Sequence, residues 1–167
     1  TLNSFTTTDV STMHYWGKAT YNEGNNLSVT LIRNMAKVTL ILNNNLQGHI
    51  AGFVNYNRTG TLVPGNFEVG TLNATNNDVA SHSNGDLGTE HYHFEHANVE
   101  NSTPLYVICE IGKLYYKIAF ANANKEYFPI IRNHAYTITI NSVEKSLGRS
   151  YDEALLADPI NDANVEV

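Results

Sequence analysis

Four residues within a stretch of six could bind a metal ion, and they are His91, His93, Glu95 and His96. If this stretch is a β-strand, His91, His93 and Glu95 lie on one face, because side chains alternate between faces. Two imidazoles and a carboxylate are ligands that zinc accepts. The spacing matches no zinc signature and fixes no fourth ligand, so a polar strand edge explains the stretch better. We therefore expect no metal and no other cofactor, and a metal-dependent enzyme is the weakest of three hypotheses.

The sequence offers no better constellation for catalysis. Serine, histidine and aspartate all occur, but no serine stands in a Gly-x-Ser-x-Gly elbow or another nucleophile context. Two carboxylate pairs are present, Asp86 with Glu90 and Asp152 with Glu153, and solvated turns and helix capping explain both. The residues therefore favour a protein that is not an enzyme.

Charge and composition exclude two further classes. The chain of 167 residues has 16 acidic and 10 basic residues, a formal net charge of −6, and its basic residues are scattered. It has no basic stripe that could neutralise nucleic-acid phosphates. No apolar run approaches the roughly 20 residues of a membrane helix. Cys109 is the single cysteine, so no disulfide forms within the chain, and its place in an apolar alternation predicts a buried thiol.

Short segments of period-two alternation dominate the chain and predict its fold. Apolar and polar side chains alternate in 27–31, 36–42, 105–111, 114–120 and 136–140, and 50–56 is a further candidate. Gly52 predicts a bulge, and Gly112-Lys113 predicts a two-residue hairpin turn with glycine first. Short strands separated by turn residues are typical of an antiparallel β-sandwich, so the sequence predicts an all-β fold.

Turn-rich and capping segments divide the chain further. Residues 70–90 are polar and rich in asparagine and glycine, which predicts a linker. We therefore divide the chain into an N-terminal β-domain, residues 1–80, and a C-terminal β-sandwich domain, residues 81–167. Ser150-x-x-Glu153 is a capping box and predicts a short helix. The alternation in 164–167 predicts the beginning of another strand.

Nine residues of the C-terminal half form an Arg-Asn-x-x-Tyr-x-Ile-x-Ile strand, a glycine-containing turn and a short helical turn. They are Arg132, Asn133, Tyr136, Ile138, Ile140, Gly148, Ser150, Glu153 and Ala154. This pattern resembles the C-terminal region of the Bacteroidia fimbrillins, the shaft, tip and anchor subunits of type V pili. Two more motifs are similar to those of the family: an Arg-x-x-Ala-Lys motif and a Glu-Asn pair, matched by Arg33, Ala36, Lys37, Glu100 and Asn101.

The resemblance implies two tandem transthyretin-like β-sandwich domains, each short here for a complete family domain. It implies a structural or adhesive fimbrial subunit that polymerises with other pilus subunits by strand exchange, with a host receptor or glycan as a further partner. It also implies an exported lipoprotein precursor located at the outer membrane of a Gram-negative bacterium. No signal peptide or lipid-attachment cysteine stands near Thr1, so the resemblance implies processing or trimming of the N-terminus.

The second hypothesis is an extracellular module that binds carbohydrate or another ligand. Five aromatic residues could form either a sugar-binding platform or part of the core: Tyr115, Tyr116, Tyr127, Phe128 and Tyr136. Arg33 and Arg132 could contact another subunit, but we expect each to anchor a strand end through fork-shaped hydrogen bonds. We expect the other residues of the family motifs to be structural as well.

Overall fold

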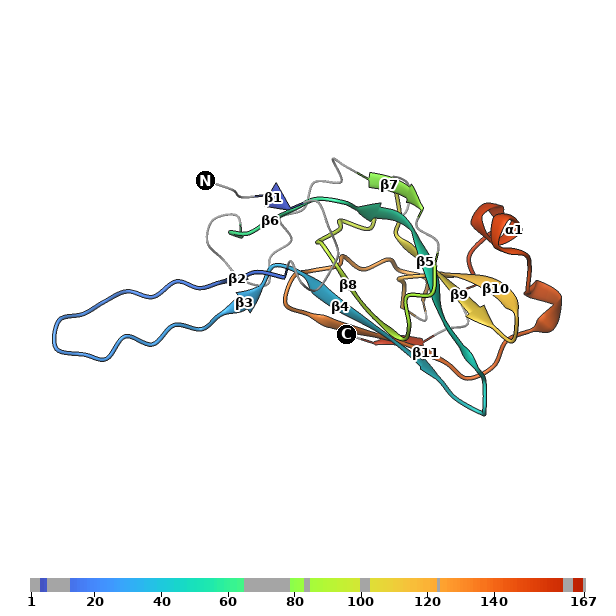
Figure 1. Cartoon of the computed structure of the whole chain (residues 1–167), viewed down its shortest axis with the longest axis horizontal. Helices are drawn as coiled ribbons and strands as arrows, with labels where there is room; N and C mark the ends of the chain where they lie inside the picture. The colour runs from blue at the N-terminus through green and yellow to red at the C-terminus, as the bar shows by residue number, and fades with distance from the viewer. Residues whose placement is uncertain are drawn as a thin grey trace.

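Two four-stranded sheets pack face to face in the computed structural model (Figure 1). The structure describes residues 4–5, 13–64, 79–82, 85–99, 103–122, 124–160 and 164–166. One sheet has the order β10-β9-β5-β7, formed by Leu114–Ala119, Tyr106–Ile111, Gly48–Asn57 and Val79–His82. The other has the order β12-β11-β4-β8, formed by Asn164–Glu166, Ala135–Ile140, Ala36–Leu42 and Glu90–His93. The predicted all-β sandwich is confirmed.

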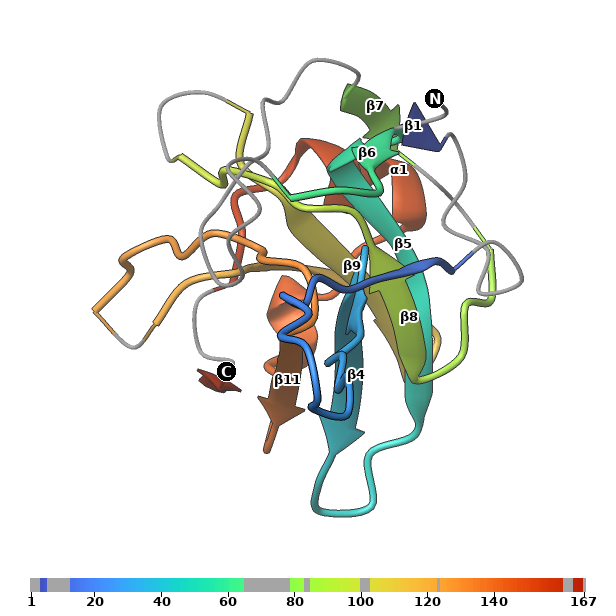
Figure 2. The ribbon, with the colours of Figure 1, turned by 90° about the vertical axis from the view of Figure 1, so that its left-hand side faces the viewer.

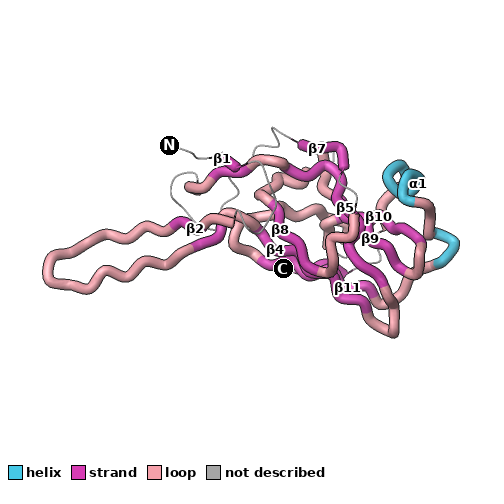
Figure 3. The backbone as a smooth tube through the Cα atoms, viewed as in Figure 1, coloured by secondary structure: helices cyan, strands magenta, loops and turns pink. Residues whose placement is uncertain are grey.

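Smaller elements lie around the two sheets. Two pairs of two-residue strands are β1 with β6 and β2 with β3, formed by Ser4–Phe5, Gly60–Thr61, Tyr15–Trp16 and Ile32–Arg33. A 3-10 helix, Lys145–Leu147, precedes α1, Tyr151–Leu156. Figure 3 shows that these two helical turns lie together at one end of the molecule.

The core lies between the two sheets and follows from the alternation seen in the sequence. On β4 the side chains of Ala36, Val38 and Leu40 are buried, and on β11 those of Tyr136, Ile138 and Ile140 are buried. The facing sheet contributes Ile50, Phe53, Val107 and Cys109 among others. Each large apolar side chain buried in this way stabilises the fold by about 1.5–3 kcal/mol. The predicted burial of Cys109 is confirmed.

Strands from both halves of the sequence share each sheet. β4 pairs in parallel with β11, from Lys37 opposite Ala135 to Leu42 opposite Ile140, and Figure 2 shows the two strands side by side. β5 pairs antiparallel with β9 in the other sheet. The expected division at residue 80 therefore does not separate two sandwiches within the described residues, because each sheet is built from strands of both halves.

Two turn predictions can be checked directly. The register between β5 and β9 shifts between Ile50 and Gly52, which confirms the predicted bulge at Gly52. Ile111 pairs with Leu114, so Gly112 and Lys113 form the predicted two-residue hairpin turn. Both have positive φ, 59° and 70°, which is the type I′ geometry and requires a left-handed conformation of Lys113 as well as of the glycine.

The strand predicted at 27–31 is wrong. β2 and β3 pair at the base of a long arm, and the chain between them runs away from the sandwich and returns (Figure 1). Leu27, Val29 and Leu31 alternate as a strand would, yet all three are exposed. The alternation misleads because no described strand of either sheet lies beside this segment to hydrogen-bond with it or cover its apolar face.

The end of the chain follows the sequence closely. Ser150 Oγ accepts a hydrogen bond from Glu153 N, and the Glu153 carboxylate accepts one from Ser150 N, which is the predicted capping box. α1 begins at Tyr151, as predicted. Residues 164–166 form β12, antiparallel to β11, which confirms the strand predicted there. Within the described residues, no helix has the length and apolarity to cross a membrane.

Candidate functional site

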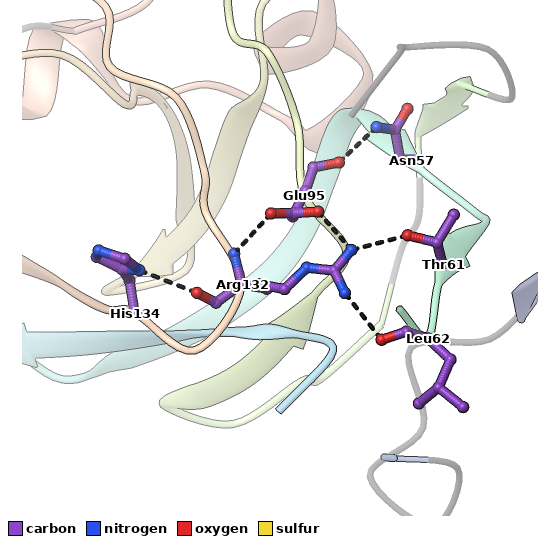
Figure 4. Close-up of polar contacts among 6 residues, drawn as sticks. All are labelled: Asn57, Thr61, Leu62, Glu95, Arg132 and His134. Atoms are coloured by element: carbon purple, nitrogen blue, oxygen red, sulfur yellow. Dashed lines mark hydrogen bonds and ion pairs between the residues drawn. The ribbon is translucent and has the colours of Figure 1, made fainter. Parts of the chain in front are cut away.

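A buried ion pair joins the segment before β11 to the segment after β8. Arg132 Nη2 lies 2.7 Å from Glu95 Oε2, and the Arg132 backbone N–H donates to Glu95 Oε1 at 3.3 Å (Figure 4). The same guanidinium donates to Thr61 Oγ1 at 2.8 Å and to the Leu62 carbonyl at 3.0 Å. Arg132 therefore fastens three segments, as the fork-shaped guanidinium allows.

Local backbone pairing sets up this contact. His96 and Ile130 form an isolated antiparallel bridge, with hydrogen bonds of 3.0 and 2.9 Å in the two directions. The bridge places Glu95 and Arg132 close together. Asn57 Nδ2 donates to the Glu95 carbonyl at 2.6 Å and fixes that backbone too. Arg132 thus hydrogen-bonds to two other segments from a position shortly before β11.

Asn133 and Tyr136, two further residues of the motif, stabilise the loop between Pro129 and β11. Asn133 has a φ of 61°, a left-handed conformation that asparagine adopts more readily than most residues. Its Oδ1 accepts a hydrogen bond from Arg33 N at 3.2 Å. The Tyr136 hydroxyl accepts from Ile131 N at 2.8 Å and donates to the Pro129 carbonyl at 2.9 Å. Asn133 and Tyr136 thus hold the loop that leads into β11.

The Arg33, Ala36 and Lys37 motif joins β4 to β8. Ala36 is fully buried opposite His93, and Lys37 Nζ lies 2.5 Å from Glu90 Oε1. The Arg33 guanidinium lies over the Tyr92 ring, 5.7 Å from its centroid, so its described contact is a cation–π contact where a fork of hydrogen bonds was expected. Glu100 and Asn101 lie outside the described residues.

The histidine cluster does not assemble into the predicted ligand trio. His91 and His93 lie on the inner face of β8 against Phe53, with ring centroids 5.3 and 3.9 Å from the phenylalanine ring. Glu95 is instead committed to Arg132. In the described part of the chain, no three histidine, cysteine, aspartate or glutamate side chains are grouped so that they could hold a metal ion.

Burial sets the protonation of these histidines. Burial lowers the pKa of His93 well below its usual value of 6.5, and the neighbouring His91 and His96 lower it further. Burial lowers the pKa of His96 to about 4, and it lowers that of His91 as well. Neither ring nitrogen of His93 has a hydrogen-bond partner. The three histidines are therefore neutral at pH 7 and pack as part of the protein interior.

The five aromatic residues proposed as a platform do not share one surface. Tyr116 and Tyr136 are buried, and Phe128 stacks on Tyr136 with centroids 5.7 Å apart. Tyr115 contacts Tyr151, and Tyr127 contacts Tyr106, on separate parts of the sheet. The sugar-binding hypothesis thereby loses the feature on which it depended.

The sequence did not indicate which strand pairs with the outer edge of β11. Within the described residues, β11 pairs with β12 at three positions, Thr137 to Thr139. Beside its end, an apolar cavity of about 90 Å³ lies between the sheets, lined mainly by Tyr116, Ile118, Ile140, Val143, Leu147 and Ile160. Of these, Tyr116, Ile118 and Ile140 belong to the alternating segments that predicted strands, and Ile160 forms an isolated bridge with Ile118.

The fold defines the class of protein, an all-β sandwich in which Arg132, Asn133 and Tyr136 hold the segment that leads into β11. No family model matches the chain, and no curated protein matches it either. Solved structures are similar to it. One is the tip fimbrial protein Mfa3 from Porphyromonas gingivalis with C-terminal truncation, at 16% identity and a TM-score of 0.48.

Two more similar structures are proposed cell adhesion proteins. The one from Bacteroides eggerthii has 17% identity and a TM-score of 0.45, and the one from Parabacteroides distasonis has 13% and 0.39. The matches cover 81%, 83% and 83% of this chain and 50%, 56% and 52% of the matched chains. This chain thus spans about half the length of each.

Proposed function

We propose that the chain is a structural and adhesive subunit of a cell-surface fimbria and not an enzyme, and that it assembles by exchange of the strand that pairs with β11. Two kinds of observation support the proposal. The motif residues resemble those of fimbrillins, and Arg132, Asn133 and Tyr136 serve in the fold to position β11. The observation that carries it is the three-residue pairing of β12 with β11 among the described residues, which a donor strand could replace.

The outer edge of β11 has the physical features of an acceptor site. β11 spans six residues, Ala135–Ile140, and among the described residues β12 pairs with three of them. A donor strand that replaced β12 would form the same antiparallel ladder with β11. Its alternate apolar side chains would point toward the cavity beside Ile140. An edge whose backbone groups are released in this way is a template for another chain.

The partners in this proposal are other subunits of the same fibre, and the place is the cell surface, at the outer membrane. The subunit could be shaft, tip or anchor. A host receptor or glycan has no corresponding feature among the described residues, because the candidate aromatic side chains lie apart or in the core.

A reversible lock on β12 tests strand exchange. Thr139 and Asn164 are paired residues of β11 and β12, so Thr139→Cys/Asn164→Cys places two thiols opposite each other. Oxidation holds β12 in place, and reduction releases it. We expect concentration-dependent oligomers, followed by light scattering, in the reduced protein and none in the oxidised one. Buried Cys109 leaves the lock undisturbed.

The matched control is a disulfide at an edge that the proposal does not use. Glu110→Cys/Tyr115→Cys joins paired residues of β9 and β10 in the same way. This variant should assemble whether oxidised or reduced. Equal assembly of the oxidised and reduced Thr139→Cys/Asn164→Cys protein, or no assembly of the unmodified chain at any concentration, would remove strand exchange.

A further inference from the structure

The arm between β2 and β3 concentrates exposed apolar surface. Among the described residues nine large apolar side chains are exposed, and five of them lie on the arm: Tyr15, Tyr21, Leu27, Val29 and Leu31. Tyr21 and Leu27 flank the turn at its tip and are 64% and 57% exposed. Exposed apolar side chains gathered on one segment are typical of sites of protein–protein contact.

The arm has little of its own to stabilise it. Its two legs are paired at the base, by Tyr15 with Arg33 and Trp16 with Ile32, and closed at the tip by a hydrogen bond from Asn25 N to the Asn22 carbonyl of 3.2 Å. A two-stranded ribbon alone is marginal in water. Docking against another surface would therefore stabilise the arm as well as bury its apolar side chains.

A groove lies beside α1, at the opposite end of the molecule from the arm (Figure 1). Its volume is about 840 Å³, within the range of ligand-sized clefts. Its apolar lining includes Leu147, Leu156, Pro159 and Ile160. Leu156 is 89% exposed, more than any other large apolar side chain described. The groove has room for the two side chains at the tip, and no room for the whole arm.

The charges of the two surfaces are compatible. The groove is lined by two basic residues, Lys125 and Arg149, and two acidic ones, Glu153 and Asp158. Residues 17–31 of the arm carry one of each sign, Lys18 and Glu23. The chain has a net charge of −6, so two copies repel each other on average. The arm and the groove each carry equal numbers of acidic and basic residues, so this net negative charge does not oppose their contact.

We infer that the arm tip of one copy docks in the α1 groove of a second copy, with Tyr21 and Leu27 packing against Leu147 and Leu156. Because the two surfaces lie at opposite ends of the long axis, the contact is head-to-tail and can repeat from subunit to subunit along a fibre without closing. The inference rests on the proposed function and adds to it a second contact between successive subunits, made by side chains and separate from the β11 edge.

Cross-linking between copies tests the contact. Two single variants, Tyr21→Cys with a small mass tag and Leu156→Cys without one, are mixed and oxidised, and the products are separated on a non-reducing gel. Both positions are exposed, so neither change affects the core. We expect a tagged–untagged heterodimer in about tenfold higher yield than with a control partner, because docking raises the local concentration of the two thiols.

Ile41→Cys is the control partner, since Ile41 is exposed on β4 and is no part of the groove. Equal yields with Leu156→Cys and Ile41→Cys would overturn the inference. The double variant Tyr21→Cys/Leu156→Cys should give a ladder of covalent multimers. A product that stops at two chains would also overturn it, because a closed dimer is then formed.

The outcome is separable from that of the β12 lock. If the lock abolishes assembly and the Tyr21–Leu156 cross-link is absent, strand exchange stands and the arm contact is wrong. If the cross-link forms and the lock has no effect, the arm contact stands and strand exchange is wrong.

Discussion

Arg132 Nη2 and Glu95 Oε2 lie 2.7 Å apart in the interior, although 37 positions separate the two residues in the chain. Their side chains are 2% and 5% exposed. Neither charge has water as an alternative partner, so each depends on the other. The pair fixes where the chain enters β11, and through it the position of the strand that pairs with β12.

Removal of the guanidinium should therefore be costly. We expect Arg132→Leu to lower the free energy of unfolding by about 3–5 kcal/mol, because it leaves the Glu95 carboxylate buried without its partner. Urea unfolding followed by circular dichroism measures this. Lys37→Ala breaks the more exposed pair with Glu90 and should cost at most about 1 kcal/mol. Similar losses for the two variants would contradict the anchoring role.

The histidines on and after β8 predict a loss of stability in acid. The pKa of His96 is about 4 in the folded protein and 6.5 ordinarily, so the unfolded chain binds more protons between these values. The contribution of neutral His96 to the free energy of unfolding is fully present above pH 6.5. It is lost as the pH decreases toward 4, and the loss for His96 alone reaches about 3 kcal/mol. His93 acts in the same direction, since its pKa is also lowered.

Unfolding free energies measured from pH 7.5 to 4.5 check this expectation. His93→Phe keeps an aromatic ring beside Phe53 and removes one titrating group, so its stability should fall less steeply with pH. Parallel curves for the unmodified protein and His93→Phe would contradict the prediction.

Cys109 should be unreactive in the folded protein. Its side chain is fully buried, and burial raises the pKa of the thiol to about 12. A bulky thiol reagent should label it only at the rate of unfolding. Cys109→Ser should cost about 1–3 kcal/mol, because the hydroxyl has no partner there. Cys109→Ala, which buries no polar group, is the matched control; fast labelling of the native protein would refute the burial.

The turn at Lys113 offers a gain in stability. Lys113 has a φ of 70°, which costs a residue with a side chain about 1 kcal/mol and costs glycine almost nothing. We expect Lys113→Gly to raise the thermal midpoint and Lys113→Val to lower it. Lys145→Gly, at a position without positive φ, should lower it. A loss of stability in Lys113→Gly would contradict this prediction. It would mean that glycine adds more conformational entropy to the unfolded chain than it relieves strain in the turn.

Local signals in the sequence were enough to predict many of the elements. The alternation in 36–42 and 136–140, the capping box at Ser150 and the bulge at Gly52 each depend on neighbours in the chain. The partner of Glu95 could not be predicted, because its distance from Arg132 is set by the bridge between His96 and Ile130. Likewise, residues 27–31 alternate as those of β4 do. The two segments differ in their neighbours, because β4 has a strand on each side and no described strand of either sheet lies beside 27–31.

The parallel pairing of β4 with β11 has a consequence for synthesis. Lys37 lies opposite Ala135, so 98 residues must follow the first strand out of the ribosome before its neighbour exists. At roughly 5–20 residues per second this takes about 5–20 s. During that time the edge of β4 that later pairs with β11 has no parallel strand beside it. Pairings of such high sequence separation also form slowly once the chain is complete. The nascent chain therefore exposes an unpaired β4 for several seconds, and chaperones can bind it during that time.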